Sequence, residues 1–381
     1  MHGPNDWENP TLLGINRLAA RSILTPYPDV KSALTYKREK SPWFHDLNGH
    51  WRFSLVDKPA AAPKSFFAPE YEDKKWDKIE VPGNWTMQGY DYPHYTNIQM
   101  PFLERPPQVP ENNPTGLYRR SFNLPKNWQS RRTVLHFGGV ESMFYVYVNG
   151  HLVGMSKDSR LPAEFDITSV VKSGKNSLAV KVLRWCDGTF MEDQDHWHHA
   201  GIHRDVFIYS TGKTYIGDIQ SSATLDDKYE NGILEVKTSI GSMDSISVGW
   251  LVQTVLLDQQ GKNIISKKLL TPVQVFEDSY SFIGNVAHCI QFVNKPHQWS
   301  AESPYLYRLV VSLINPRGKV QESVALKIGF KKIEVQNREL LINGKAVLIK
   351  GVNRHDHDDI KGKVVTRESM LKDIRTMKQF N

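Results

Sequence analysis

From Leu47 to about residue 210 the apolar residues fall in short strand-like segments with almost no helical periodicity, and this pattern predicts β-strands rather than helices. The clearest strand patterns there are Arg132 to Val140, Met143 to Val148 and Ser177 to Trp185. Asn149-Gly150 indicates a tight hairpin, because this pair supplies both left-handed residues of a type I′ turn. Long Pro-rich loops separate the strands. We therefore predict a jelly-roll-like sandwich over residues 44–210.

After residue 210 the alternating segments become shorter and more evenly spaced. They are Ile233 to Ile240, Val248 to Leu257, Cys289 to Val293, Tyr305 to Ile314 and Ser323 to Phe330. Gln260-Gly261 and Asn315-Pro316-Arg317-Gly318 are typical turn sequences between them. About 120 residues of this kind predict an immunoglobulin-like β-sandwich over residues 211–330, although the Cys-Trp-Cys pattern of antibody domains is absent. Residues 1–43 show no sustained period and are predicted to lie as an arm on a larger body.

Residues 331–381 combine a hairpin, an apolar segment and a helix pattern. Asn343-Gly344 indicates the hairpin, and Val347 to Val352 has the apolar, β-branched character of a strand buried on both faces. Thr366 is placed to cap a helix that continues to the region of Asn381. The apolar residues at helical spacing in it are Met370, Leu371, Ile374 and Met377. Strand, polar loop and helix form one β/α unit, so we predict the start of a β/α barrel, whose full length is about 250 residues.

Composition and charge exclude several classes of protein. The 381 residues are 40% hydrophobic, which is ample for two or three domains. The net charge of +7 is spread among 41 acidic residues, so no nucleic-acid partner is expected. The two cysteines match neither a disulfide framework nor a zinc motif. No signal peptide is seen at Met1 to Pro10 and no apolar run approaches the roughly 20 residues of a membrane span, so we expect a soluble, cytoplasmic protein with no membrane partner.

The segment from Arg184 to His199 is the first cluster of residues suited to chemistry. Four carboxylates, three histidines and two tryptophans follow a predicted strand there. They are Asp187, Glu192, Asp193, Asp195, His196, His198, His199, Trp185 and Trp197. Tryptophan rings pack against sugar rings and carboxylates accept hydrogen bonds from sugar hydroxyls, so a carbohydrate site is one interpretation. A divalent metal site and a polar loop with buried tryptophans are the alternatives.

Two further clusters carry candidate binding residues. Pro82 to Asn97 is rich in aromatic and amide side chains, which suit polyols but are also common in loops. The polar segment after Val352 contains His355, at the strand end where barrel enzymes hold their catalytic groups. In an extended chain His355, His357 and Asp359 share one face, so a zinc hydrolase and a solvated turn are alternatives there.

Short motifs along nearly the whole chain resemble one family, the large bacterial-type β-galactosidases of glycoside hydrolase family two. Each motif is weak alone, but their common order makes the resemblance specific. The motifs are Asp6 to Pro10, Asn16 to Ala20, Leu47 to Gly49, Asn84-Trp85, Gly89 to Asp91, Tyr95 to Asn97, Glu111 to Gly116, Asp158 to Pro162, Glu192 to Asp195, Arg204 to Val206 and Gly351 to His355.

The resemblance implies a multi-domain, mostly β fold with four parts. These are the N-terminal arm (residues 1–43), a jelly-roll sugar-binding domain (44–210), an immunoglobulin-like β-sandwich (211–330) and the incomplete start of a catalytic TIM barrel (331–381). It also implies hydrolysis, with retention, of terminal β-galactosides such as lactose, by a protein that is a homo-oligomer when complete. The alternative is a non-catalytic carbohydrate-binding protein with two sandwiches and a vestigial tail, and continuation of the reading frame beyond Asn381 would decide between them.

The resemblance also assigns roles to single residues. Asn97 corresponds to a substrate contact, Asp195 to a residue that binds galactose and Na⁺, and His355 to the histidine that stabilises the transition state. With that role for His355, the zinc interpretation loses its support. The family's acid and nucleophile are glutamates on later barrel strands, so we expect the 381-residue chain itself to be inactive.

An accessory Mg²⁺ site is the point where this sequence departs from the family. The ligand positions match Asp6, Asn9 and Asp187, but Lys157 stands where the family has an amide side chain. An ammonium group has three donors and no acceptor, so it cannot be a ligand of Mg²⁺. We therefore predict that Lys157 replaces the ion by pairing with Asp187.

Overall fold

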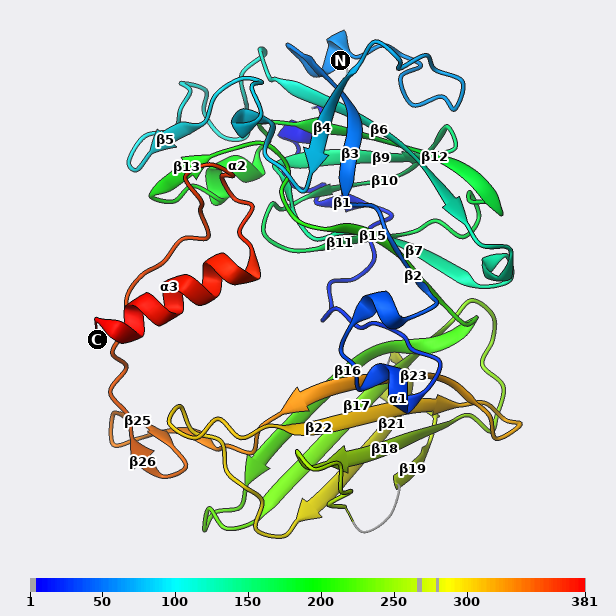
Figure 1. The fold of residues 1–381 in the computed structure, drawn as a ribbon, viewed down its shortest axis with the longest axis vertical. Helices are drawn as coiled ribbons and strands as arrows, with labels where there is room; N and C mark the ends of the chain where they lie inside the picture. The colour runs from blue at the N-terminus through cyan, green and yellow to red at the C-terminus, as the bar shows by residue number, and fades with distance from the viewer. Residues whose placement is uncertain (1–4, 266–268, 279–280, 381) are drawn as a thin grey trace.

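Two β-sandwiches and a C-terminal tail make up the chain in a computed structural model, which describes residues 5–265, 269–278 and 281–380 (Figure 1). The first sandwich lies at the top of the view, the second at the bottom, and helix α3 beside them at the left. Residues 1–4 of the predicted arm and Asn381 of the predicted helix lie outside the described residues. None of the helices in the described ranges is long and apolar enough to cross a membrane.

The first sandwich packs a seven-stranded antiparallel sheet against a four-stranded one. The larger sheet runs in the order β1 (Gly14–Ile15), β10 (His151–Lys157), β9 (Met143–Val148), β12 (Gly174–Leu183), β6 (Thr115–Leu124), β3 (Gly49–Val56) and β4 (Asp77–Val81). The smaller one runs in the order β11 (Ala163–Asp166), β7 (Arg132–Phe137), β15 (Val206–Thr211) and β2 (Phe44–Asp46). Two short ribbons pair β5 (His94–Thr96) with β13 (His196–His198) and β8 (Val140–Glu141) with β14 (Gly201–Ile202).

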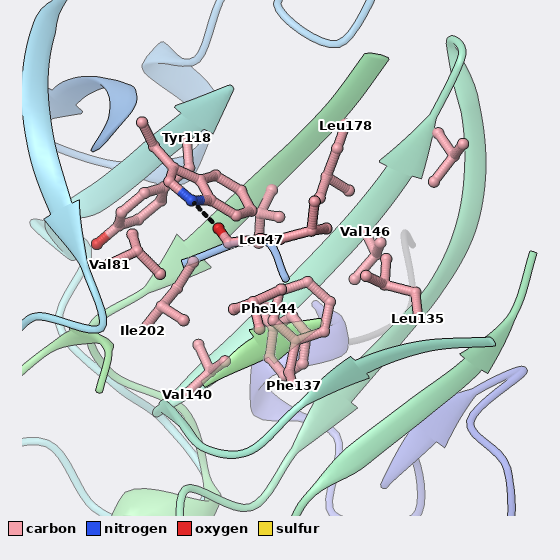
Figure 2. Close-up of a cluster of buried hydrophobic side chains, with 14 of the residues drawn as sticks. Leu47, Val81, Tyr118, Leu135, Phe137, Val140, Phe144, Val146, Leu178 and Ile202 are labelled. Carbon is pink, nitrogen blue, oxygen red and sulfur yellow. Dashed lines mark hydrogen bonds between the residues drawn. The ribbon is translucent and has the colours of Figure 1, made fainter. Parts of the chain in front are cut away.

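Alternating side chains from both sheets form the core of this sandwich. Figure 2 shows Phe137 and Phe144 meeting in it, with ring centroids 4.9 Å apart. The buried indole of Trp51 donates a hydrogen bond of 2.9 Å to the carbonyl oxygen of Leu47, so its polar atom is satisfied inside the apolar core. The predicted hairpin is confirmed, since Asn149 and Gly150 have φ angles of 50° and 85° between β9 and β10.

The N-terminal segment connects the two sandwiches. Strand β1 pairs with the end of β10 and so extends the larger sheet. Further along, Leu24 is buried in the core of the second sandwich, and Tyr27 forms a β-bridge with Ser323. The short helix α1 (Val30–Ala33) follows this bridge.

The second sandwich packs two four-stranded antiparallel sheets face to face. One sheet consists of β16 (Thr214–Leu225), β17 (Gly232–Ser242), β21 (Ser281–Val293) and β20 (Gln274–Asp278), and the other of β19 (Leu269–Pro272), β18 (Leu251–Leu257), β22 (Tyr307–Ile314) and β23 (Val320–Ile328). The strand predicted from Val248 begins only at Leu251, because Gly249 takes a φ of 100° that an extended strand cannot contain. The strand predicted from Cys289 is longer and begins at Ser281.

The tail forms a small sheet and one helix, but not the predicted strand from Val347 to Val352. A meander of β24 (Ile333–Gln336), β25 (Glu339–Ile342) and β26 (Lys345–Ala346) comes first. The segment after it is irregular, and Leu348 is 79% exposed. A strand needs a neighbour for its N–H and C=O groups, and none of the described residues forms a ladder with this segment. The predicted helix is confirmed as α3 (Arg367–Gln379), whose first turn is capped by the Thr366 hydroxyl accepting from the Ser369 N–H at 3.2 Å.

Candidate sugar-binding site

A two-stranded ribbon brings two of the predicted site residues together. Strand β5 pairs antiparallel with β13, and Thr96 lies opposite His196. Asn97 follows β5 and Asp195 precedes β13, so both lie at the same end of the ribbon, and both are exposed. Two segments far apart in the sequence thus place an amide and a carboxylate at one end of the same ribbon, and both groups can bind sugar hydroxyls.

The outward face of this ribbon is aromatic. Tyr95 is 52% exposed and Trp197 is 41% exposed, and their ring centroids are 5.4 Å apart. The Tyr95 hydroxyl donates a hydrogen bond of 2.5 Å to Asp195 Oδ1, and this bond raises the pKa of Tyr95. The sequence motif contained Tyr95, but no residue pattern indicated that it would orient the carboxylate. The ribbon therefore presents flat apolar rings beside a fixed carboxylate, which is the chemistry that a sugar ring binds.

The segment after β26 folds back onto this ribbon and places His355 beside it (Figure 1). The rings of His355 and His196 are 5.3 Å apart and nearly perpendicular. The ring of His357 stacks over Trp197 with a centroid distance of 6.4 Å. The three sequence clusters therefore meet at one place, although His355 arises from the tail and the ribbon from the first sandwich.

Beneath this surface lies a buried ion pair that the sequence did not indicate. Lys363 Nζ lies 2.9 Å from Glu141 Oε1 and 2.8 Å from Oε2. Burial alone would raise the pKa of the Glu141 carboxyl, but the Lys363 ammonium and nearby histidines outweigh it and lower that pKa to about 2. The two residues are 222 positions apart and belong to no shared motif, so only the fold reveals the pair.

Buried histidines surround the ion pair. Burial lowers the pKa of His199 and of His203 to about 3, and that of His196 to about 4. The Lys363 ammonium lowers all three pKa values further. These side chains are therefore neutral near pH 7. His199 accordingly acts as a neutral hydrogen-bonding group, with Nδ1 2.8 Å from Thr86 Oγ1.

The other carboxylates of the first cluster have structural partners. Glu192 accepts hydrogen bonds from the N–H and hydroxyl of Ser159, at 2.6 and 2.5 Å, and so fixes the turn before β11. Asp193 lies 3.3 Å from the ring of buried His198. Among the described residues no group of three or more His, Cys, Asp or Glu side chains is arranged to hold a metal ion. The described part of the chain therefore offers no set of ligands in support of a divalent metal in this cluster or of zinc at His355, His357 and Asp359.

Asp187 is paired as the sequence predicted. Lys157 Nζ lies 2.7 Å from Asp187 Oδ1, and the side chains are 4% and 8% exposed. The same ammonium donates to the carbonyl oxygen of Asn9 at 2.9 Å. The Lys157 ammonium therefore neutralises the Asp187 carboxylate and occupies the Asn9 carbonyl, so the residues present do not fit a Mg²⁺ ion.

Three models of one family match successive parts of the chain. They are the sugar binding domain of glycosyl hydrolases family 2 over residues 44–212, glycosyl hydrolases family 2 over residues 214–331, and the TIM barrel domain of glycosyl hydrolases family 2 over residues 333–381. A sugar-binding domain, a second sandwich and a barrel segment thus follow one another in the chain, each matched by a model of the same family. The chain belongs to glycosyl hydrolases family 2.

Curated relatives are about 40% identical to this chain over its whole length. A β-galactosidase of Priestia megaterium is 40% identical over 388 residues, covering 100% of this chain and 37% of the relative. A β-galactosidase of Psychromonas ingrahamii is 41% identical over 378 residues, covering 99% of this chain and 36% of the relative. The chain thus spans little more than a third of the length of these relatives.

Solved structures share the fold at lower identity. The β-glucuronidase of Bacteroides uniformis superposes with a TM-score of 0.70 at 21% identity, covering 88% of this chain and 38% of that one. The β-glucuronidase of Bifidobacterium dentium gives a TM-score of 0.70 at 21% identity, covering 88% and 55%. At this identity the similarity establishes the arrangement of domains and not the substrate.

Proposed function

We propose that the protein to which this chain belongs is a β-galactosidase that hydrolyses terminal, non-reducing β-D-galactose residues with retention, from substrates such as lactose. The observation that carries this proposal is the identity of about 40% with named β-galactosidases, which extends over the whole chain. The complete protein is further proposed to act in the cytoplasm as a homo-oligomer. The rival function, non-catalytic carbohydrate binding, would use the same ribbon but no barrel chemistry.

The ribbon residues would bind the galactose ring. The Asp195 carboxylate would accept hydrogen bonds from sugar hydroxyls while Tyr95 holds its orientation. The Asn97 amide, at the same end of the ribbon, can both donate and accept. Trp197 and Tyr95 would cover the apolar face of the ring. His355 would donate a hydrogen bond that strengthens as charge develops in the transition state.

We propose that the Na⁺ site of the family is kept in this protein and that the Mg²⁺ site is lost. Asp195 would be a ligand of Na⁺, since a carboxylate oxygen is a hard donor, with the remaining ligands supplied from outside the described residues. The Mg²⁺ site would be replaced by the ion pair of Lys157 and Asp187. A metal ion is thus proposed next to the sugar but not in the region of Asp187.

Substituting Asp195 tests the proposed sugar and sodium contact. In the complete protein, Asp195→Asn is expected to lower kcat/KM for a β-galactoside by roughly tenfold to a hundredfold, the value of one charge-assisted hydrogen bond. Activation by Na⁺ should weaken in the same variant, and thermal unfolding should hardly change because the residue is exposed in a loop. Asp193→Asn is the matched control, and its Na⁺ dependence should stay as in the parent. Equal Na⁺ activation of the parent and Asp195→Asn would contradict the assignment.

Substituting Lys157 tests the proposed replacement of magnesium. Lys157→Gln removes the ammonium and supplies an amide oxygen beside Asp187, so the variant is expected to gain a Mg²⁺ site. Its free energy of unfolding should then increase by about 2.7 kcal/mol when Mg²⁺ is in hundredfold excess over Kd, and its melting temperature should rise accordingly. The unsubstituted chain should show no such rise. A Mg²⁺-dependent rise of the same size in the unsubstituted chain would refute the replacement.

A further inference from the structure

We propose that Glu141 and Lys363 are positioning residues that fasten the segment 355–363, here called the docking loop, onto the sugar-binding domain and thereby hold His355 at the ribbon. The role of His355 in this inference rests on the proposed function, whereas the docking itself rests on contacts within the chain. None of these contacts involves Asn97 or Asp195, so the inference adds a second set of residues to the site.

The ion pair is the strongest of these contacts. Both oxygens of Glu141 lie within 2.9 Å of Lys363 Nζ, and each side chain is 8% exposed. Glu141 Oε1 also accepts from the backbone N–H of His199 at 3.2 Å. Removing one partner of a buried pair leaves an uncompensated charge, so each partner strongly favours the docked loop.

The backbone of the loop is fastened at the same point. The Lys363 N–H donates to the side-chain oxygen of Asn84 at 2.8 Å. The residue before it, Gly362, has a φ of 65°, and a Cβ there would lie 2.7 Å from that oxygen. Only glycine allows this close approach without displacing Asn84. The loop therefore fits the surface of the first sandwich closely.

A tight turn connects the anchored residue Lys363 to the histidines of the loop. The N–H and C=O groups of Asp358 and Gly362 form two mutual hydrogen bonds of 2.8 and 2.9 Å. The Asp358 side chain accepts from two further backbone N–H groups inside the turn, those of Ile360 and Lys361. The turn is thus closed at its base, so fixing Lys363 also fixes the residues that precede Asp358.

The other end of the loop contacts the ribbon through rings. His357 Nε2 lies 3.1 Å from His199 Nε2, and its ring stacks over Trp197. His355 lies against His196 through a perpendicular ring contact. Ring contacts of this kind are weak compared with a buried ion pair. Loss of the pair is therefore expected to release His355 from the ribbon even though these rings remain.

Hydrogen exchange of the loop in the 381-residue chain tests the docking. We expect Glu141→Gln and Lys363→Met each to accelerate amide exchange of residues 355–363 at least tenfold, with β9 as an internal reference. The double variant Glu141→Gln/Lys363→Met leaves no unpaired buried charge and should exchange more slowly than either single variant. Lys157→Met, which breaks an equally buried pair elsewhere, is the control and should leave loop exchange unchanged.

A spectroscopic readout separates positioning from general loss of stability. In spectra of the chain with ¹⁵N-labelled histidine, the His357 and His355 signals should move toward solvent-exposed values in Lys363→Met. They should return in Lys363→Arg, whose guanidinium can form a two-point pair with Glu141. Unchanged histidine signals and loop exchange in the single variants would overturn the proposal, as would faster exchange in the double variant than in both single variants.

Turnover by the complete protein distinguishes a failure of this positioning proposal from a failure of the proposed function. Positioning of His355 predicts that Lys363→Met lowers kcat by a larger factor than it raises KM, because substrate contacts at Asn97 and Asp195 persist. If the complete protein cleaves galactosides and Lys363→Met leaves kcat unchanged, the positioning role fails while the function stands. If it cleaves none but loop exchange responds as expected, the function of His355 fails and the docking stands.

Discussion

The 381-residue chain, purified by itself, is expected to hydrolyse no β-galactoside above background. Retaining glycosidases need two carboxyl groups roughly 5 to 5.5 Å apart, one as acid and one as nucleophile. Two carboxylates of the first sandwich already have partners, since Glu141 pairs with Lys363 and Glu192 accepts hydrogen bonds from Ser159. General acid catalysis alone typically contributes about 10² to 10⁴-fold. Without the catalytic acid and nucleophile, no transition state forms that His355 could stabilise.

A chromogenic β-galactoside, assayed with chain from a host that lacks its own β-galactosidase, measures this. Circular dichroism should show in the same preparation that the two sandwiches are folded. Turnover that tracks the chain and disappears on substitution of a residue within it would contradict the expectation. It would place a complete catalytic pair inside these 381 residues.

Lowering the pH from 7 to 5 is expected to destabilise the sugar-binding domain by about 2 kcal/mol for each of His199 and His203. Burial lowers the pKa of both rings from 6.5 to about 3. Below pH 6.5 these two histidines therefore bind protons in the unfolded chain but stay neutral in the folded chain. The free energy of unfolding falls until the pH approaches 3. The Glu141 carboxyl, with a pKa lowered to about 2, adds a further loss only below its ordinary value of 4.5.

Urea unfolding followed by tryptophan fluorescence at pH 7 and pH 5 measures this loss. The signal reports mainly on the first sandwich, because all ten tryptophans except Trp250 and Trp299 precede residue 212. His203→Gln removes one titrating ring, so its stability should fall by about 2 kcal/mol less over the same pH interval. An equal fall in His203→Gln and in the unsubstituted chain would show that His203 is not buried in its neutral form.

Local sequence rules predicted the elements whose cause is local. The Asn149-Gly150 turn and the Thr366 cap each depend on a few neighbouring side chains, and both form as expected. The predicted strand at Val347 to Val352 was wrong for a different reason. Its apolar pattern describes a strand between neighbours, and pairing with neighbours is a property of the fold and not of the segment.

The site could be predicted only in part, for the same reason. Motif order drew attention to Asp195, Asn97 and His355, and a charge argument predicted the contact of Lys157 with Asp187. The docking of the tail on the ribbon had no signal, because Glu141 and Lys363 lie on strand and loop segments that look ordinary in sequence. Their pairing depends on how β8 and the tail approach each other in space.

The most direct test of the proposed function is a substrate comparison with the protein encoded by the complete reading frame. Matched chromogenic β-galactosides and β-glucuronides differ only in the sugar, so their kcat/KM ratio reports what the ribbon and barrel recognise. We predict efficient release of galactose with retained configuration, and negligible cleavage of the glucuronide. Preference for the glucuronide, or binding of galactosides without any hydrolysis by the complete protein, would contradict the account.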